Sequence, residues 1–493
     1  MNLKEKASIT KSKLIALLLV LMLATAVLTS AFTYIVLSNP PNTNLALDIE
    51  IQPRDAKLVV GQIRKFWVIV HNGSSPYVAE WYSNGTSIGS GLTVDFSFSK
   101  RCAYTVLSVL VEDSRGNVGY DETRVYDPTY ITSGSFTDDY SYLISYKNST
   151  HIQAKNGSTG SIQYSGTSFS TILQSCLDTG SGLFFIRGGS YTVDDTILYT
   201  YNDTYIQGEG IANTILTFAN NVNKDMFNIT NKDFVGLSDL RINGNKAQQS
   251  SGNGIRIYST VDAVAWSSYY FDNVQVFNFK ENGIYSGGSY PGGETRYADK
   301  AFITKCIISQ NDGAGVKIEN YGYEWKIIGN TIDRNAQSGI WLVGSSEHLI
   351  QGNHIWQNQH GITLYSNATH TVEIGINEIT TSDMHGMYIY GDTTNNGPAN
   401  LTITGNTVTA NSQSGAGSYS GIYIANSTWL LITGNHLSDR QASPTQGWGL
   451  EEVSGDYNVI VANIAVGNTV GGITKTGANT KVNFCYNGTS WIS

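Results

Sequence analysis

The sequence predicts an all-β chain: a right-handed parallel β-helix with a preceding small β-sandwich domain and an N-terminal transmembrane helix. Three observations carry this prediction. Glycine makes up 51 of the 493 residues and charged residues only 14%, which is typical of β-structure with many tight turns. A glycine–apolar pair and an asparagine turn recur together along the second half of the chain. A long uncharged segment lies close to the N-terminus.

The uncharged segment runs over residues 14–37 and follows a basic segment, residues 1–13, that holds Lys4, Lys6, Lys11 and Lys13. Basic flanks stay in the cytoplasm, so the rest of the chain is expected outside the cell, anchored at its surface. A cleaved signal peptide is the competing interpretation, in which case the protein is secreted. Thr29-Ser30-Ala31 offers a small-residue cleavage site, but the apolar region of a signal peptide usually spans only about 7 to 15 residues.

Charge and sequons agree with an exterior protein. The formal net charge of −9 makes nucleic acid an unexpected partner. The Asn-X-Ser/Thr sequons, which are expected to lie on an exposed glycoprotein surface, include those that begin at Asn72, Asn84, Asn148, Asn228, Asn367, Asn426 and Asn487. Four cysteines, at 102, 176, 306 and 485, lie far apart without metal-ligand spacing, so we expect buried thiols.

Residues 45–127 alternate in short strand-like runs separated by turns such as Asn72-Gly73 and Asn84-Gly85. Six or seven strands in about 80 residues, with Trp81 on a middle strand, predict an immunoglobulin-like β-sandwich. Cys102 has no second cysteine nearby, so the usual inter-sheet disulfide is absent. We expect this domain to act as a spacer and residues 128–167 to be a connector.

The β-helix is expected over residues 168–493, opened by a short amphipathic helix that covers the end of the stack. Ser168 is the expected N-cap and Gly180 lies just past the end. The apolar residues that follow helical spacing are Phe169, Ile172, Leu173, Cys176 and Leu177.

Two independent registers mark the repeat. The glycine–apolar pairs begin at Gly254, Gly283, Gly315, Gly339, Gly361, Gly386, Gly421, Gly449 and Gly472. The turn asparagines are Asn330, Asn353, Asn377, Asn406, Asn435 and Asn463. The shortest spacings in both registers, roughly 22 to 24 residues, correspond to one coil of three short strands, and the longer spacings indicate inserted loops. Leucine-rich and propeller repeats lack their signatures here.

Coils of a β-helix stack about 4.8 Å apart, so equivalent residues form columns. The Ile, Val and Leu residues of the Gly-Asn-X-Ile segments are therefore expected to fill the interior. The turn asparagines from Asn330 to Asn435 are expected to form one hydrogen-bonded ladder.

The segments that carry a family resemblance are LFFIRGGSYTVDDTI, YIQGEGIANTILTF, LSDLRINGNKAQQSSGNGIRI and the Gly-Asn-X-Ile repeats. They resemble the pectate-lyase-like β-helix superfamily of polysaccharide lyases, glycoside hydrolases, epimerases and tailspike-type proteins, over roughly residues 155–485. The resemblance is specific for fold, because these motifs make turns.

The polygalacturonase branch of that superfamily carries Asn-Thr-Asp, paired aspartates, Gly-His-Gly and Arg-Ile-Lys motifs. This chain has only Asn330-Thr331-Ile332-Asp333 and His360-Gly361 and no Arg-Ile-Lys, which disfavours such a hydrolase. Lyases of the superfamily combine calcium-holding aspartates with a basic residue. The residues that match this only by type are Asp312, Asp333, Arg334, Asp383, Asp439 and Arg440; none lies in a family-specific motif, so solvated turn residues are the alternative.

The register of the repeat places several polar side chains close together. His360 and His385 each precede a repeat glycine and lie one coil apart, so they should stack at about 5 Å. Asp383 and Asn358, at equivalent turn positions of the same two coils, should stack alongside. We therefore expect His360, His385 and Asp383 to be catalytic, moving a proton of a sugar hydroxyl or binding a divalent cation such as calcium. A chance pairing in a polar turn is the alternative.

Aromatic residues gather in the longest inserted loops. Tyr and Trp present flat apolar faces with a polar tip, which suits stacking on sugar rings. The residues expected to bind substrate are Trp266, Tyr269, Tyr270, Tyr290, Tyr297, Tyr323 and Trp325. The alternative is that some of them pack loops onto the helix wall.

The sequence thus predicts a cell-surface carbohydrate-active protein, a polysaccharide lyase or another polysaccharide-modifying enzyme, whose partner is a polysaccharide or surface glycan. A non-catalytic glycan-binding or adhesive protein on the same scaffold is the alternative, favoured by the missing family motifs. Metal handling is disfavoured further, because only five methionines occur and none cluster with cysteine.

Overall fold

The structure is a computed structural model that describes residues 47–54, 56–58, 61–83, 86–98, 104–126, 140–258, 268–287, 298–319, 322–391, 397–487 and 490–492. The chain divides into two compact units, Met1–Ser135 and Phe136–Ser493. The uncharged segment 14–37 lies outside the described residues. No helix within the described ranges is long and apolar enough to span a bilayer.

The first unit consists of two β-sheets around one core. A three-stranded antiparallel sheet has the order β1-β3-β6, and a second sheet has the order β2-β8-β7-β4-β5. Both contribute buried residues, including Ile51, Phe66, Trp81 and Leu107. The Trp81 indole donates a hydrogen bond to the carbonyl of Gly91 at 2.8 Å. The sandwich is therefore observed, and its immunoglobulin-like assignment stays a prediction.

The strands of this unit are β1 (Ile49–Gln52), β2 (Ala56–Lys57), β3 (Arg64–Val70), β4 (Tyr77–Ser83), β5 (Thr86–Ser90), β6 (Thr93–Phe96), β7 (Tyr104–Asp113) and β8 (Val118–Tyr126).

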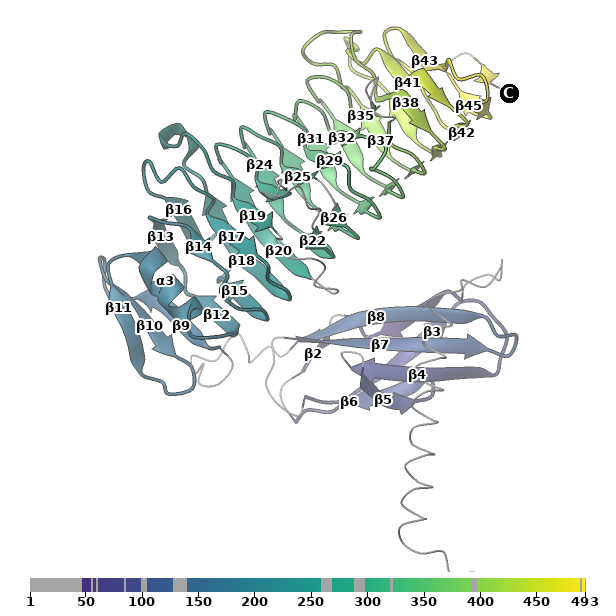
Figure 1. Cartoon of the computed structure of the whole chain (residues 1–493). Coiled ribbons are helices and arrows are strands. Elements are labelled where there is room, and N and C mark those ends of the chain that lie inside the picture. The colour runs from purple at the N-terminus through teal and green to yellow at the C-terminus, as the bar shows by residue number, and fades with distance from the viewer. Residues whose placement is uncertain are drawn as a thin grey trace, which may run out of the picture. The chain divides into compact units, whose positions relative to one another are not determined.

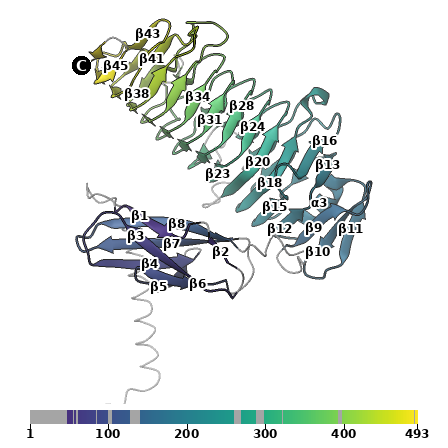
Figure 2. The same ribbon diagram turned by 180° about the vertical axis from the view of Figure 1, so that it is seen from behind.

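The second unit is a parallel β-helix, confirming the predicted architecture. Successive coils stack along one axis from α3 to β43 (Figure 1), and the view from behind shows the same order (Figure 2). One face is an 11-stranded parallel sheet. Its strands are β14 (Ile197–Leu198), β17 (Phe227–Thr230), β19 (Ile255–Tyr258), β21 (Ile284–Ser286), β25 (Val316–Glu319), β29 (Ile340–Val343), β32 (Ile362–Tyr365), β35 (Met387–Tyr390), β38 (Ile422–Thr428), β41 (Trp448–Asp456) and β43 (Gly471–Thr474).

The other strands of each coil pair in parallel with those of the coils before and after. They are β12 (Gly182–Ile186), β13 (Gly189–Val193), β15 (Thr204–Gln207), β16 (Thr214–Phe218), β18 (Val235–Asn243), β20 (Tyr269–Phe277), β23 (Ala301–Thr304), β24 (Ile307–Ser309), β27 (Lys326–Ile328), β28 (Thr331–Asp333), β30 (Leu349–Gln351), β31 (His354–Trp356), β33 (Glu373–Gly375), β34 (Glu378–Thr380), β36 (Thr402–Thr404), β37 (Thr407–Thr409), β39 (Leu431–Thr433), β40 (His436–Ser438), β42 (Val459–Val461) and β44 (Lys481–Asn483). Two short additions are β22 (Ala298–Asp299) paired with β26 (Gly322–Tyr323), and β45 (Cys485–Tyr486) paired with β46 (Trp491–Ile492).

The N-terminal end of the stack is covered by helix α3 (Phe169–Leu177). Ser168 caps the helix by accepting a hydrogen bond from the backbone N–H of Thr171, as its position predicted. The expectation that 128–167 is only a connector is wrong, because β9 (Tyr142–Tyr146), β10 (Ile152–Asn156) and β11 (Ile162–Gly166) form an antiparallel sheet within it. β9 pairs in parallel with β12, so this sheet extends the stack.

The interior confirms both predicted columns. Ile332, Ile355 and Ile379 are fully buried in register. The asparagine ladder is continuous: the Asn330 amide donates to Asn353 Oδ1 at 3.0 Å, and the Asn353 amide donates to Asn377 Oδ1 at 2.9 Å. The ladder continues through Asn406, Asn435 and Asn463.

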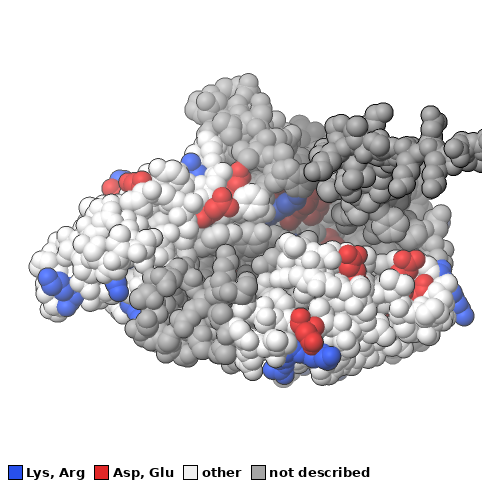
Figure 3. Space-filling view, turned by 90° about the horizontal axis from the view of Figure 1, so that it is seen from below, with Lys and Arg blue, Asp and Glu red and all other residues white. Residues whose placement is uncertain are grey.

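The cysteines and the surface charges also agree with the sequence. Cys176, Cys306 and Cys485 are buried free thiols, and Cys102 lies outside the described residues. On the face drawn in Figure 3, basic and acidic side chains form small groups of both signs on a mostly uncharged surface.

Candidate functional site

His360 and His385 lie where coils turn into the 11-stranded sheet, each directly before a glycine. The pairing of Ile362 with Met387 places the two turns in register. The imidazole rings stack with centroids 5.7 Å apart and planes 8° from parallel, which confirms the predicted column.

The two imidazoles are almost fully shielded from solvent, with exposed fractions of 9% and 7%. Burial lowers the pKa of His360 to about 4 and that of His385 to about 3, the latter also through repulsion by His360. Both rings are therefore neutral at pH 7. Nδ1 of His385 accepts a hydrogen bond from the Ser420 backbone N–H at 2.9 Å, whereas Nδ1 of His360 has no hydrogen-bond partner.

Three tyrosines shield the histidine pair. Tyr388 stacks on both rings, with centroid distances of 4.8 Å to His360 and 5.1 Å to His385. Tyr423 lies 4.6 Å from His385, and Tyr419 contacts the same ring edge-on at 5.1 Å. Because Tyr388 and Tyr423 occupy the outward positions of β35 and β38, the imidazoles lie on the outer side of the sheet, beneath the phenols.

The side chain of Asp383 does not stack beside that of Asn358 as predicted, although the Asp383 backbone N–H donates to the Asn358 carbonyl at 2.9 Å. The Asn358 side chain is fully buried and donates to the carbonyl of Ile332, because it is a rung of a second interior ladder. The equivalent ladder position in the next coil is Ser382, whose backbone N–H donates to Asn411 Oδ1. Asp383 itself is an exposed residue, and partial desolvation of its carboxyl group raises its pKa.

No group of three or more His, Cys, Asp and Glu side chains in the described part of the chain is arranged to hold a metal ion. The structure therefore places His360 and His385 together but adds no carboxylate to them as a third metal ligand. The catalytic role of His360, His385 and Asp383 stays a prediction.

The histidines border one continuous column of outward-facing side chains on the 11-stranded sheet. Strand pairing from β19 to β41 places one such residue in each coil. The column consists of Arg256, Tyr285, Lys317, Trp341, Thr363, Tyr388, Tyr423 and Glu451; Thr363 is buried and the other seven are half-buried. We call it the outer column. With about 4.8 Å per coil it extends over roughly 34 Å.

The first half of the outer column is cationic and aromatic. The Arg256 guanidinium lies 4.4 Å from the ring centroid of Tyr285, and Lys317 Nζ lies 4.3 Å from that of Trp341. Glu319 accepts a 2.5 Å hydrogen bond from the Tyr285 hydroxyl and pairs with Lys317 at 2.5 Å. Burial and the neighbouring Glu319 raise the pKa of Tyr285, so its phenol stays protonated at neutral pH. Glu319, and Glu281 close to Tyr285, balance part of the charge of Arg256 and Lys317.

The second half is phenolic and ends in a carboxylate. Glu451 accepts a 2.5 Å hydrogen bond from the Ser420 hydroxyl. Glu319 and Glu451 are five coils apart, about 24 Å, whereas the two carboxyl groups of a glycosidase lie within about 10 Å. This pair therefore cannot hydrolyse one glycosidic bond together.

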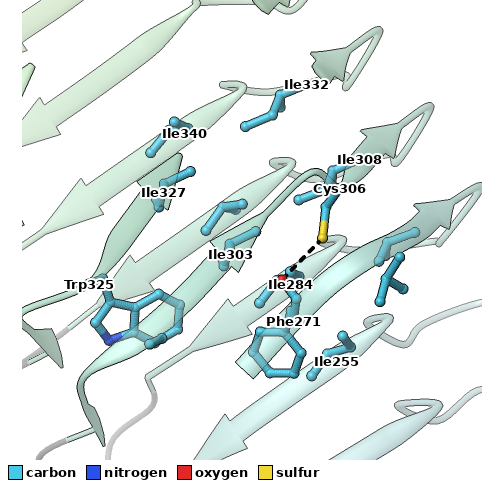
Figure 4. Close-up of a cluster of buried hydrophobic side chains, with 14 of the residues drawn as sticks. Ile255, Phe271, Ile284, Ile303, Cys306, Ile308, Trp325, Ile327, Ile332 and Ile340 are labelled. Atoms are coloured by element: carbon cyan, nitrogen blue, oxygen red, sulfur yellow. Dashed lines mark hydrogen bonds between the residues drawn. The ribbon is translucent and has the colours of Figure 1, made fainter. Parts of the chain in front are cut away.

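The predicted substrate-binding aromatics divide into three groups. Trp325 and Tyr269 were predicted wrongly as ligand contacts, since both are buried, at 0% and 2% exposure. The Trp325 indole donates to the carbonyl of Ala298 at 2.8 Å and lies among core isoleucines (Figure 4). Tyr270 is exposed on β20 and stacks on Phe302, and Tyr323 is half-buried on β26. The remaining three, Trp266, Tyr290 and Tyr297, lie outside the described residues.

The outer column was readable from the sequence. Each of its members follows a repeat glycine by two positions, as in Gly254-Ile255-Arg256. In a strand, alternate residues face opposite sides, so the residue after the buried apolar position must point outward. The prediction of His360 and His385 rested on the turn positions of the same repeat.

Comparison with known proteins fits this architecture. The family model for the right handed beta helix region matches residues 231–397 and 350–487, which together exceed half of the chain. The chain belongs to this right-handed β-helix family. No curated protein matches the sequence.

Solved structures share the fold of this β-helix. The A-module of a mannuronan C-5 epimerase from Azotobacter vinelandii is 16% identical and superposes with a TM-score of 0.51, covering 64% of this chain and 96% of that one. A family 28 exopolygalacturonase from Yersinia enterocolitica is 10% identical with a TM-score of 0.49, covering 90% and 95%. At these identities the likeness shows the β-helix fold alone.

Proposed function

We propose that this chain is a polysaccharide-modifying enzyme that binds an acidic polysaccharide along the outer column. The observation that carries the proposal is the outer column itself: two cations and several aromatic faces lie in one row on a rigid sheet, and two tyrosine-covered imidazoles lie beside that row. An extended polymer lying along the β-helix axis would meet these groups one after another. The resemblance to a mannuronan epimerase fold is consistent with this substrate class.

The two halves of the outer column have different roles in this proposal: the cationic half binds the substrate and the phenolic half reacts with it. Arg256 and Lys317 offer charge-assisted hydrogen bonds to sugar carboxylates, while the neighbouring aromatic faces hold sugar rings. Tyr388 is the half-exposed group above His360 and His385, so it is the side chain that meets the reacting sugar. The imidazoles are positioning residues that act through this phenol.

This arrangement suits removal of a proton from the carbon that carries the carboxylate. Neutralising a carboxylate makes the adjacent C–H bond more acidic. Tyr388 accepts the proton of this C–H bond as its phenol passes its own proton to a neutral imidazole. Two outcomes follow: elimination of the glycosidic oxygen, which breaks the chain and leaves a double bond, or return of a proton from the other face, which inverts the carbon. We propose a lyase or epimerase of this type.

The test is an assay on full-length protein with a panel of acidic polysaccharides. Ultraviolet absorbance detects unsaturated products of a lyase, and incorporation of solvent deuterium at carbon detects an epimerase. We expect the double variant Arg256→Ala/Lys317→Ala to raise KM at least about tenfold, since each lost charge pair is worth about 1 kcal/mol or more. Tyr388→Phe should lower kcat with little change in KM.

A matched control is His354→Gln, because His354 lies exposed on β31 in a different column and should leave both constants unchanged. Failure of the wild-type protein to bind any acidic polysaccharide would overturn the proposal. Binding that survives the loss of Arg256 and Lys317 would place the substrate elsewhere.

Non-catalytic glycan binding is the second candidate function. It is favoured by the isolation of Asp383, which leaves the two imidazoles without a carboxylate partner among the described residues. Under this alternative the wild-type protein binds acidic glycans through the outer column but yields neither unsaturated product nor deuterium exchange.

A further inference from the structure

A concave surface lies at a corner of the β-helix, away from the outer column. It is an open hollow of about 350 Å³, near the lower end of the size range of small-molecule pockets. Its floor is made by the first residues of β30, β33 and β36, which pair in register as Leu349, Glu373 and Thr402.

The rim of the hollow is a column of residues two positions before these strands. Glu347, Thr371 and Asn400 all line the hollow and all have left-handed backbone, with φ between 54° and 63°. In the next two coils, strands β39 and β42 continue the same register. The equivalent residues there are Trp429 and Tyr457, with φ of 62° and 56°.

Trp429 is therefore one coil, about 4.8 Å, beyond Asn400, which lines the hollow. Its ring stacks on that of Tyr457 with centroids 4.8 Å apart and planes 9° from parallel. Both rings are nevertheless open to solvent, at 59% and 48%. Since Asn400 is a short side chain, the face of Trp429 toward the hollow has no aromatic neighbour in that column.

Neither the left-handed backbone nor packing in the core explains why aromatic residues occupy positions 429 and 457. Asn and Gly adopt a left-handed backbone with least strain, and Asn400 follows that rule one coil earlier. Large aromatic residues are disfavoured in this conformation, and burying only about half of each side chain offsets only part of that cost. The aromatic pair is consequently expected to serve a surface role.

The negative charge of the hollow favours an uncharged ligand over an acidic one. Two carboxylates, Glu347 and Glu373, line it, and no Lys or Arg is among its lining residues. Acidic sugars would be repelled. Hydroxyl and amide groups from Thr371, Thr402 and Asn400 suit hydrogen bonds to sugar hydroxyls.

We propose that this corner site, formed by the hollow and the Trp429–Tyr457 pair, binds uncharged sugar units. One sugar ring stacks on Trp429 while its hydroxyl groups meet Asn400 and Glu373. The corner site stands on its own observations and does not depend on the outer column being catalytic. It would hold neutral parts of a glycan, or a second neutral glycan.

The test is isothermal titration of full-length protein with neutral hexasaccharides built from glucose, mannose, galactose and N-acetylglucosamine. We expect at least one of them to bind, and Trp429→Ala to weaken that binding at least about tenfold, the effect of losing roughly 1.4 kcal/mol of stacking and contact. Tyr457→Ala should weaken it less, because Tyr457 supports the ring and is farther from the hollow. Acidic oligosaccharides should bind equally to wild type and both variants.

Trp491→Ala is the matched control. Trp491 is also exposed and its ring lies 5.3 Å from that of Tyr486, but it belongs to β46, outside the columns that form the corner site, so neutral-sugar binding should not change. Melting temperatures of all variants verify folding. The proposal is overturned if no neutral hexasaccharide binds, or if Trp429→Ala and Tyr457→Ala bind it as tightly as the wild type.

Discussion

At the scale of single residues, the histidine pair shows how neighbours change what a side chain can do. His360 and His385 stack as their register predicts, yet the tyrosines that follow the repeat glycines shield them from water. Burial without a carboxylate partner keeps both rings uncharged. Such a pair is suited to positioning a phenol and unsuited to binding an anion directly.

Burial of the two imidazoles also predicts a pH-dependent stability. An unfolded histidine has a pKa near 6.5, whereas the folded values are about 4 and about 3. Between the folded and the unfolded pKa values, the unfolded chain binds more protons than the folded chain. The free energy of unfolding is therefore highest above pH 6.5 and decreases as the pH falls toward the folded pKa values. We expect each histidine to lower the free energy of unfolding by about 2 kcal/mol at pH 5 relative to pH 7.

Guanidinium unfolding at pH 7 and pH 5 measures this loss. The variant His360→Phe/His385→Phe keeps two stacked rings without titratable groups, so its stability should fall less over the same interval. His354→Phe, on an exposed column, should behave as the wild type. Identical pH dependence of the double variant and the wild type would show that the pair does not titrate on unfolding.

At the scale of elements, the asparagine ladder holds the coils in register. Asn353 accepts hydrogen bonds from the backbone and side chain of Asn330, and donates to the carbonyl of Ile327 and to Asn377. All of these groups are buried, so each would be left without a partner if the amide were removed.

We therefore expect Asn353→Ala to lower the free energy of unfolding by about 3 kcal/mol or more. Asn367→Ala is the control, because Asn367 is exposed in the turn after β32 and should change stability by less than about 0.5 kcal/mol. Chemical denaturation of the three proteins compares them. Equal stability of Asn353→Ala and the wild type would mean that water replaces the ladder bonds.

The strands and coils could be predicted from the sequence where the glycine and asparagine repeats mark them. The glycine and asparagine registers predicted the coil, the buried isoleucines and the ladder, because a column of identical residues depends only on spacing. Strands β9 to β11 were missed because they pair antiparallel and carry neither marker. Trp325 was misassigned because sequence cannot distinguish a loop residue from one that turns into the core.

The candidate site was predictable only where the spacing of the repeat determines which residues lie side by side. Stacking of the histidines followed from register, but their burial depends on Tyr388, Tyr419 and Tyr423, which come from different coils. Asp383 and Asn358 share a spacing to their glycines but point differently, because only Asn358 occupies an interior ladder. Side-chain direction at a turn depends on local backbone, which spacing alone does not specify.

At the scale of the molecule, the β-helix separates two chemistries on one rigid scaffold. The outer column carries cations on the 11-stranded sheet, and the corner site carries carboxylates beside exposed aromatic rings. Because coils stack with fixed spacing, each site is formed by several coils and neither requires a moving loop among its named residues. A polymer with both acidic and neutral units could engage both sites.

Such a protein would act where polysaccharide is found, outside the cell, and we propose that its N-terminal segment holds it there. Residues 14–37 carry no charge, follow four lysines and form a stretch long enough to span a bilayer. We expect the full-length protein to sediment with membranes and to stay there in high salt, because hydrophobic insertion is not screened by ions. Detergent should release it.

A variant that begins at residue 40 is the matched control and should stay in the supernatant under the same conditions. Sequencing of the mature N-terminus distinguishes anchoring from cleavage. An intact segment 1–37 in the membrane fraction supports the anchor, whereas a mature N-terminus near Phe32 in the soluble fraction would show that the segment is a cleaved signal peptide and that the protein is secreted.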